Sequence, residues 1–481
     1  MKINRNMSAV ITNKQLLRTE NRLTASMERL SSGLKINSPG DNPSGMAISN
    51  KMKAQIRGLD QSKSNTTDAI SVMQIADGAL NEATSILQRM RELSVQAANG
   101  TNSLSERESI QEEIDELVKE IDRISSDTEY NTKVLLDGSS DTRVYATPKS
   151  AERIRISDHV PMGNYDVVVQ EMGDYAHATM PDLNGLDVEG VITINGVEVG
   201  IQKNKVDNQY QKEMRDAIEA AGGSVTDMNG NEMEFRSRAT GSSQEFKIVF
   251  PANIAEAAGV DTDPDWEYDP ETNTYSTLQI GKDAVVEAGN GLSDTATVTA
   301  SGNRVFVTDQ GGFSIDFMLN DKAHYNGELY EDENGFTQTS DGVLSLEVSD
   351  VGRMVIQTGA NQYQHIEVRI PEVSSKSMYL DTIDMTVYHG PEDAMVTLDD
   401  AIAYMNSVRA GIGAYQNRLE YTEGSLAATN ENMTSAYSTL LDTDMAQEMT
   451  EYTQQNVLEQ AAISVLSQAN EIPQKVLSLL S

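Results

Sequence analysis

A heptad repeat of apolar residues runs along the segment that follows Ala69, in alternating steps of four and three. Its positions are Met73, Ala76, Leu80, Ala83, Leu87, Met90, Ser94 and Ala97. A seam held over about four heptads is typical of a coiled-coil helix rather than of an ordinary surface helix. The pattern predicts a helix of about 40 residues that begins near Gly58 and is about 60 Å long.

Two further segments carry the same repeat. One follows residues 99–102; Ser105 and Glu108 have the spacing of a capping box at its start. Its seam positions are Ile110, Ile114, Leu117, Ile121 and Ile124. The seam near the end of the chain comprises Val408, Ile412, Tyr415, Leu419, Thr422, Leu426, Thr429, Met433, Ala436 and Leu440. Because the three seams come from both ends of the chain, they predict one elongated multi-helix rod in which these ends lie side by side.

The outermost segments are also amphipathic. The apolar positions near the start are Leu23, Met27, Leu30 and Leu34, and those in the closing stretch include Val465, Val476, Leu477 and Leu480. Neither segment has enough apolar surface to form a domain alone. Two interpretations stay open: short helices packed on the rod, or apolar stripes that copies of the chain complete.

A break separates the first of these segments from the rod. Residues 30–49 read LSSGLKINSPGDNPSGMAIS and contain Gly33 and Gly40, which tolerate backbone angles that a helix excludes. Pro39 and Pro43 remove backbone donors and disfavour helix at the residues before them. We therefore expect these four residues to form a joint between two helical layers.

Between the helical ends, the pattern changes to the period of β-strands. Asn195 and Gly196 lie between alternating apolar residues in VITINGVEVGI, which predicts a tight hairpin. A helical stretch, EMRDAIEAAGG, follows, and EMEFRSRATGSSQEFKIVF alternates again as two strands. A second β-rich region runs from about Thr277 to Gly352. The centre is thus predicted to form one or two α+β domains that project from the rod.

The charge balance narrows the classes of partner. The chain has 37 basic and 74 acidic residues, and residues 141–353 alone contribute −23 of the net −37. So acidic a surface disfavours binding to nucleic acid or to anionic lipid. No stretch approaches the roughly 18 apolar residues of a membrane-spanning helix, so membrane insertion is not expected. The start of the chain also lacks the apolar run of a cleaved signal peptide.

The residues that carry chemistry are scarce or scattered. The chain has no cysteine, which excludes disulfides and thiolate sites. The HExxH spacing of a zinc protease is absent. The stretch that begins at Asp261 places Asp263 and Asp265 like ligands of a calcium loop, but the Gly at the sixth position and the acidic residue at the twelfth are missing. We therefore expect a solvated acidic turn there, no metal or cofactor, and no enzymatic activity.

Several stretches resemble the conserved ends of bacterial flagellin, in the same order along the chain. They are LSSGLKINSPGDNPSGMAIS, QRMRELSVQAANGTNS, NTKVLLDGS, QNRLE and SVLSQANEIPQKVLSLLS. The stretch from Gly359, GANQYQHIEVRIPEV, is similar to the short β segment that precedes the C-terminal rod helix in that family. The resemblance covers about 1–140 and 354–481.

The resemblance implies an α+β protein with a coiled-coil rod and three regions. The expected inner-core domain comprises 1–42 and 443–481, and the expected outer-core rod comprises 43–140 and 354–442 with a small β segment. A variable, surface-exposed α+β region would span 141–353. Within it, the strand and helix order over about 186–250 resembles the flagellin IN module.

The resemblance also implies a function. Flagellins leave the cell unfolded through the flagellar type III export channel, without a cleaved signal, and polymerise beneath a cap into the extracellular filament used for motility. The implied partners are other copies of the subunit, the filament cap and hook–filament junction proteins, and an export chaperone. An alternative assignment is a hook–filament junction protein, which shares coiled ends but matches the closing segment less closely. A surface adhesin is not expected, because it would normally carry an N-terminal signal and an anchor, and neither is recognised in this sequence.

One stretch further resembles the segment through which flagellins are bound by the host Toll-like receptor 5. This stretch is QRMRELSV, residues 88–95. The resemblance implies receptor-binding positions at Gln88, Arg89, Leu93, Gln96 and Glu113, with Arg89 as the anchor. From the residues alone, a solvated charged surface or a lateral contact between subunits would be favoured for this face.

Overall fold

The computed structural model divides into two compact units, each formed by segments that are distant in sequence. The structure describes residues 6–157, 159–183, 185–203, 208–229, 232–260, 265–320, 323–331, 337–349, 351–387 and 389–480. The terminal unit contains residues 1–70, 356–366 and 417–481, and the central unit contains residues 71–355 and 367–416.

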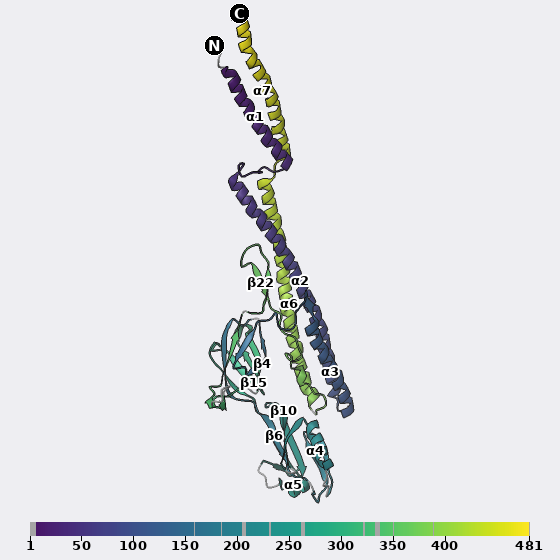
Figure 1. The fold of residues 1–481 in the computed structure, drawn as a ribbon. Coiled ribbons are helices and arrows are strands. Elements are labelled where there is room, and N and C mark those ends of the chain that lie inside the picture. Colours follow the sequence, from purple (N-terminus) through teal and green to yellow (C-terminus); the bar gives the residue numbers. More distant parts are fainter. Residues whose placement is uncertain are drawn as a thin grey trace. The chain divides into compact units, whose positions relative to one another are not determined.

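Five long helices come from the two ends of the chain (Figure 1). They are α1 (Met7–Ser32), α2 (Pro43–Ala97), α3 (Leu104–Asp127), α6 (Gly390–Leu441) and α7 (Met445–Leu480). Helices α2 and α6 contribute residues to both units. In the terminal unit, α1 packs against α7 in an antiparallel hairpin.

The seam predicted on α2 forms the core of the helical part of the central unit. Its positions from Met73 to Ala97 are all buried, most of them completely. Ion pairs join α2 to both neighbouring helices: Arg89 Nη2 lies 2.8 Å from Glu113 on α3, and Arg409 Nε on α6 lies 3.0 Å from Asp77. The predicted multi-helix coiled coil is confirmed.

Three details of the helical prediction were wrong. Helix α2 begins at Pro43 rather than near Gly58, because the Asn42 side chain accepts a hydrogen bond from the Gly45 amide and caps it. Helix α3 begins one residue after Ser103, so Ser103 pairs with Glu106, and the predicted box at Ser105 and Glu108 does not form. In the C-terminal seam, Thr429 and Ala436 are exposed.

The centre of the chain forms two β-modules, one inserted into the other. The first consists of two four-stranded sheets with the strand orders β14-β5-β20-β3 and β15-β16-β17-β4. Its strands are β3 (Val144–Thr147), β4 (Ala151–Ile156), β5 (Gly163–Glu171), β14 (Val285–Ala288), β15 (Thr297–Ser301), β16 (Arg304–Thr308), β17 (Ser314–Leu319) and β20 (Val343–Val348). Residues from both sheets share one apolar core, which includes Val167, Val307, Phe317 and Leu346.

The second β-module follows β5 in sequence and ends before β14. Its sheets have the orders β6-β10-β9 and β12-β13-β11-β7-β8, and they share a core with α4 (Asn208–Ala220) and α5 (Ala252–Ala258). The strands are β6 (Tyr175–Met180), β7 (Gly190–Ile194), β8 (Val197–Ile201), β9 (Gly223–Asn229), β10 (Glu232–Thr240), β11 (Glu245–Pro251), β12 (Glu267–Asp269) and β13 (Thr274–Ile280). The predicted hairpin at Asn195 and Gly196 is confirmed, with φ of 45° and 85°.

Three small two-stranded sheets complete the fold. They are formed by β1 (Glu129–Tyr130) with β2 (Lys133–Val134), β18 (Leu329–Glu331) with β19 (Thr337–Thr339), and β21 (Met354–Gln357) with β22 (His365–Val368). The last pair is the β segment expected near Gly359. Short 3-10 turns span Gln310–Gly312 and Leu380–Thr382.

The described residues contain neither a helix long and apolar enough to cross a membrane nor a group of His, Asp and Glu side chains that could hold a metal ion. Asp261 and Asp263 of the calcium-like stretch lie outside the residues that the structure describes.

Candidate assembly and recognition surfaces

The face of α1 that packs on α7 is lined mainly by small, polar and leucine side chains. Buried or partly buried positions recur in steps of three and four: Ala9, Thr12, Leu16, Thr19, Leu23, Ser26 and Leu30. Thr19 and Ser26 are the two that are fully buried. The helix therefore meets its partner through a heptad seam of low apolar content.

The matching face of α7 is more polar still. Its buried or partly buried positions include Glu448, Tyr452, Gln455, Glu459, Ala462, Leu466 and Ala469. At one end of the hairpin, Asn6 Nδ2 donates to the Ala469 carbonyl at 2.8 Å; at the other, Arg29 Nε donates to Glu448 Oε1 at 3.0 Å. Polar contacts thus hold both ends of the antiparallel pair.

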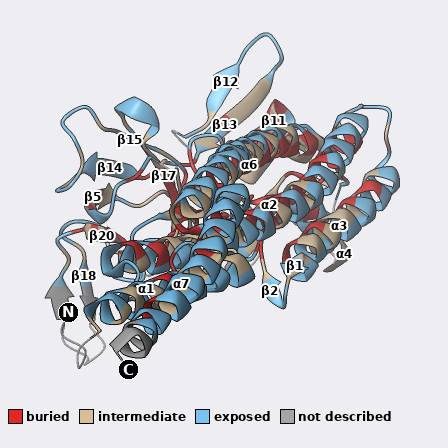
Figure 2. Cartoon of the chain, turned by 90° about the horizontal axis from the view of Figure 1, so that it is seen from above, coloured by how far each residue is buried: buried red, intermediate tan, exposed pale blue. Residues whose placement is uncertain are grey.

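The large apolar side chains of this hairpin point away from the seam. Those that are at least 45% exposed are Met7, Val10, Ile11, Leu17 and Met27 on α1, and Met445, Met449, Val457, Leu458, Ile463, Val465 and Ile472 on α7. Figure 2 shows the two helices as largely exposed ribbons. A shallow apolar hollow on α7 is lined by Met449, Thr450, Thr453, Gln454, Val457 and Leu458. Exposed apolar side chains gathered on one pair of helices are typical of interaction faces.

The sequence placed four residues of α1 on a single apolar stripe, and the structure divides them. Leu23 and Leu30 are partly buried on the seam, whereas Met27 is 53% exposed. Leu34 is not in α1 at all, because the helix ends at Ser32. On α7, Val465 is exposed, and the side chains of Val476, Leu477 and Leu480 lie outside the part of the chain that the structure describes.

The predicted joint begins where Gly33 ends α1. Gly33 has φ of 73° and donates its amide to the Arg29 carbonyl at 2.8 Å, which is the αL cap that glycine favours. The residues that follow α1 lie beside the connection between α6 and α7. Lys35 N donates to the Leu441 carbonyl, and Thr443 N donates to the Gly33 carbonyl at 3.0 Å. Both chain crossings between the helical layers are therefore hydrogen-bonded to each other.

The rest of the joint is a turn held by Asp41. Its carboxylate accepts from the amides of Asn37 and Ser38 at 3.0 and 2.8 Å, and these bonds lower the pKa of Asp41. A lowered pKa means that the turn is favoured above the ordinary pKa of the carboxyl and weakens as the pH falls through the lowered value. Pro39 and Gly40 lie within the turn, and Gly40 keeps a negative φ. Pro43 is the first residue of α2 rather than part of the break.

The predicted recognition patch lies on α2 and α3 in the central unit. Gln88, Arg89 and Gln96 are exposed. The Arg89 guanidinium donates from Nε and Nη2 to Glu113 Oε1 at 3.1 and 2.8 Å, and its hydrogen bond to Glu113 raises the pKa of Arg89. The guanidinium is thus permanently charged and is held in place by the second helix.

Leu93 does not belong to this patch. It is only 2% exposed, because it lies one position before Ser94 on the side of α2 that faces the bundle. A partner that approaches the patch therefore meets the polar side chains first, and the role of Leu93 stays a prediction.

The ends of the chain match two family models. Residues 3–141 match the bacterial flagellin N-terminal helical region, and residues 395–480 match the bacterial flagellin C-terminal helical region.

Full-length relatives give the same result. Polar flagellin C of Vibrio parahaemolyticus is 31% identical over 99% of this chain and 99% of its own length. A flagellin of Clostridium tyrobutyricum is 30% identical over 98% of this chain and 99% of its own, and one of Salmonella muenchen is 29% identical over 99% of both. The chain therefore belongs to the bacterial flagellin family.

Proposed function

We propose that this flagellin polymerises into the flagellar filament through the outward apolar faces of α1 and α7. The observation that carries the proposal is the exposure of large apolar side chains on the outer faces of the terminal hairpin. Its two helices pair through leucine and alanine mixed with threonine, serine, glutamine and glutamate, while many methionine, valine and isoleucine side chains and some leucines remain in contact with water.

This arrangement is stabilised when other copies cover the outer faces. Burial of apolar area contributes about 25 cal/mol for each Å² removed from water, and the leucines of the seam are only partly buried by the pairing. The hairpin alone is therefore weakly held, and contacts with neighbouring subunits would contribute most of its stability.

Flagellar type III export and the extracellular filament follow as the proposed route and location. The lack of cysteine suits a chain that is threaded unfolded through a channel, because no disulfide can form within it. The proposed partners are other copies of this chain, the filament cap and junction proteins, and an export chaperone. The full-length match to flagellins favours the filament subunit over the junction protein.

Seeded sedimentation tests the proposal. Monomer mixed with sheared filament seeds should convert to pelletable filaments, whereas variants that lack residues 1–35 or 445–481 should remain in the supernatant with the bundle of α2, α3 and α6 still folded. The helicity of the truncated variants is measured by circular dichroism, which separates a loss of assembly from unfolding. Filaments of normal length from either truncated variant would contradict the proposal.

We further propose that the exposed patch around Arg89 is bound by host Toll-like receptor 5, with Gln88, Gln96 and Glu113 beside the anchor. The support is the exposed position of the patch and the fork of Arg89, which Glu113 holds ready for bidentate or stacked contacts.

Arg89→Ala should weaken binding of the monomer to the receptor ectodomain by about 30-fold, the equivalent of about 2 kcal/mol for an interfacial arginine hot spot. The matched control is Arg123→Ala, which removes an exposed arginine on α3 that pairs with Glu120 and Asp127. Surface plasmon resonance gives both affinities. If Arg89→Ala binds as tightly as Arg123→Ala, the patch is not the receptor site.

A further inference from the structure

Four charged side chains of the first β-module come from three neighbouring strands of one sheet. Arg153 and Arg155 come from β4, Arg304 from β16 and Asp316 from β17. Arg304 donates from Nε and Nη2 to the two oxygens of Asp316 at 3.1 and 2.8 Å, and Arg155 Nε donates to the same carboxylate at 2.9 Å. The Asp316 side chain is 9% exposed, so one buried carboxylate is shared by two guanidiniums.

Tyr379 lies at the centre of this group. The guanidinium carbons of Arg304, Arg153 and Arg155 are 4.3, 5.1 and 5.4 Å from the centroid of its ring. Its backbone is in the left-handed region, with φ of 59°. Its hydroxyl is buried without a hydrogen-bond partner, and burial raises its pKa to about 12. A buried hydroxyl without a partner and a left-handed backbone each cost free energy. We infer that the contacts of the ring with the three guanidiniums offset these costs.

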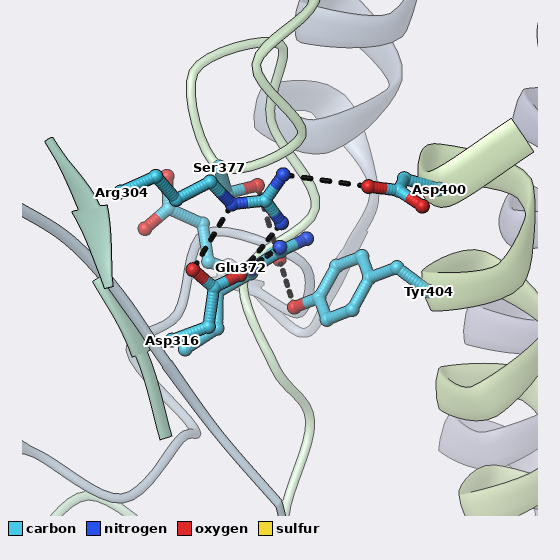
Figure 3. Close-up of polar contacts among 7 residues, drawn as sticks. Arg304, Asp316, Glu372, Ser377, Asp400 and Tyr404 are labelled. Carbon is cyan, nitrogen blue, oxygen red and sulfur yellow. Dashed lines mark hydrogen bonds and ion pairs between the residues drawn. The ribbon is translucent and has the colours of Figure 1, made fainter. Parts of the chain in front are cut away.

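The opposite side of the cluster belongs to helix α6 and to the segment before it. Figure 3 shows Arg304 between Asp316 and Asp400, with Tyr404 one turn further along the same helix. Arg304 Nη1 lies 3.4 Å from Asp400, and Arg155 stacks on the Tyr404 ring at 4.9 Å. Arg153 donates two hydrogen bonds of 2.8 and 2.7 Å to Asp381, just before α6.

We propose that these residues form a clamp that fixes the position of the first β-module on helix α6. The Arg–Tyr clamp consists of Arg153, Arg155, Arg304 and Asp316 from the module, and Tyr379, Asp381, Asp400 and Tyr404 from the rod side. Arg304 and Tyr379 are the positioning residues, since Arg304 bonds to both sides and Tyr379 is the surface on which three cations stack. This goes beyond the assembly function, which concerns the ends of the chain.

The geometry favours a fixed attachment over a flexible tether. Bidentate guanidinium–carboxylate pairs and stacked rings are directional, so they hold an orientation that apolar burial alone would leave free. The charges in the clamp also balance, because each of the three arginines has a carboxylate partner. We infer that the module projects from the rod in one defined orientation.

Distances between two spin labels test the clamp, and the absence of native cysteine makes the labelling specific. The labels are placed at Thr299→Cys on β15 and Ser407→Cys on α6, both of which are exposed positions. In the otherwise unchanged chain, the distance distribution should be narrow. Tyr379→Leu, which keeps the bulk but removes the ring, and Arg304→Gln should each broaden it.

Two controls separate positioning from mere folding. Tyr379→Phe removes only the unpaired hydroxyl and should keep the narrow distribution, as should Arg123→Gln on α3. Amide exchange in β16 and β17 reports whether the module is still folded in each variant. If Arg304→Gln or Tyr379→Leu unfolds the module, Asp400→Asn, whose side chain is 57% exposed, replaces them. A narrow distribution in every folded clamp variant, or equal broadening by Tyr379→Phe, would overturn the proposal.

Discussion

Replacing Val457 and Ile463 by aspartate in one variant should abolish seeded assembly while the terminal hairpin still forms. Both residues are more than half exposed and lie off the seam of α7, so the substitutions leave the contacts with α1 unchanged. In a filament, each introduced carboxylate would be buried against apolar side chains at a cost of several kcal/mol per ion. Sedimentation after seeding measures the loss, and circular dichroism measures the retained helicity.

Val285→Asp is the matched control for this variant. Val285 lies on β14 of the first β-module and is 47% exposed, so Val285→Asp makes the same kind of substitution, with one added charge instead of two, on a surface outside the proposed contacts. It should assemble as the unmodified chain does. Equal loss of assembly in both variants would mean that added charge, rather than the position on α7, is responsible.

Asp316→Asn should destabilise the first β-module by about 3–5 kcal/mol, the usual cost of breaking a buried ion pair from one side. The amide keeps the size of the carboxylate but leaves Arg155 and Arg304 without their shared charge. Because the chain has several modules, a single global unfolding curve is not two-state. Native-state amide exchange of β4, β16 and β17 gives the local free energy of unfolding instead.

The comparison for this variant is Asp294→Asn, an exposed aspartate in the same module. The local free energy of unfolding obtained from its amide exchange should stay within about 0.5 kcal/mol of the value for the unmodified chain, as for most surface substitutions. Equal exchange in both variants would show that Asp316 is not a stabilising partner of the two arginines.

The rod could be predicted from the sequence because burial repeats with the heptad. Met73, Leu80 and Leu87 are spaced at seven residues and are fully buried, as the repeat required. The hairpin at Asn195 and Gly196 was equally local, since its two positive φ values are encoded in the dipeptide. Features that depend on nearby residues of one element were therefore accessible.

The packing face of the terminal hairpin was harder to predict because small and polar residues share it with leucine. We assigned the seam from the largest apolar residues, which joined Met27 and Leu34 to Leu23 and Leu30. The seven-residue spacing of Thr12, Thr19 and Ser26 would have indicated the true packing face, but small polar residues carry a weak signal.

The Arg–Tyr clamp had no signal in the sequence. Its members range from Arg153 to Tyr404, and only the folded chain brings Arg304 beside Tyr379. Ion pairs between distant strands and loops follow no spacing rule, so a sequence pattern cannot find them.

The most direct test of assembly through the outer faces is the reactivity of a single introduced cysteine. Val457→Cys should react rapidly with a maleimide in the monomer, because the position is 61% exposed, and should become protected in seeded filaments. Thr299→Cys on β15 should react equally in both states. If Val457→Cys reacts in the filament as fast as in the monomer, the outer face of α7 does not form the contact between subunits.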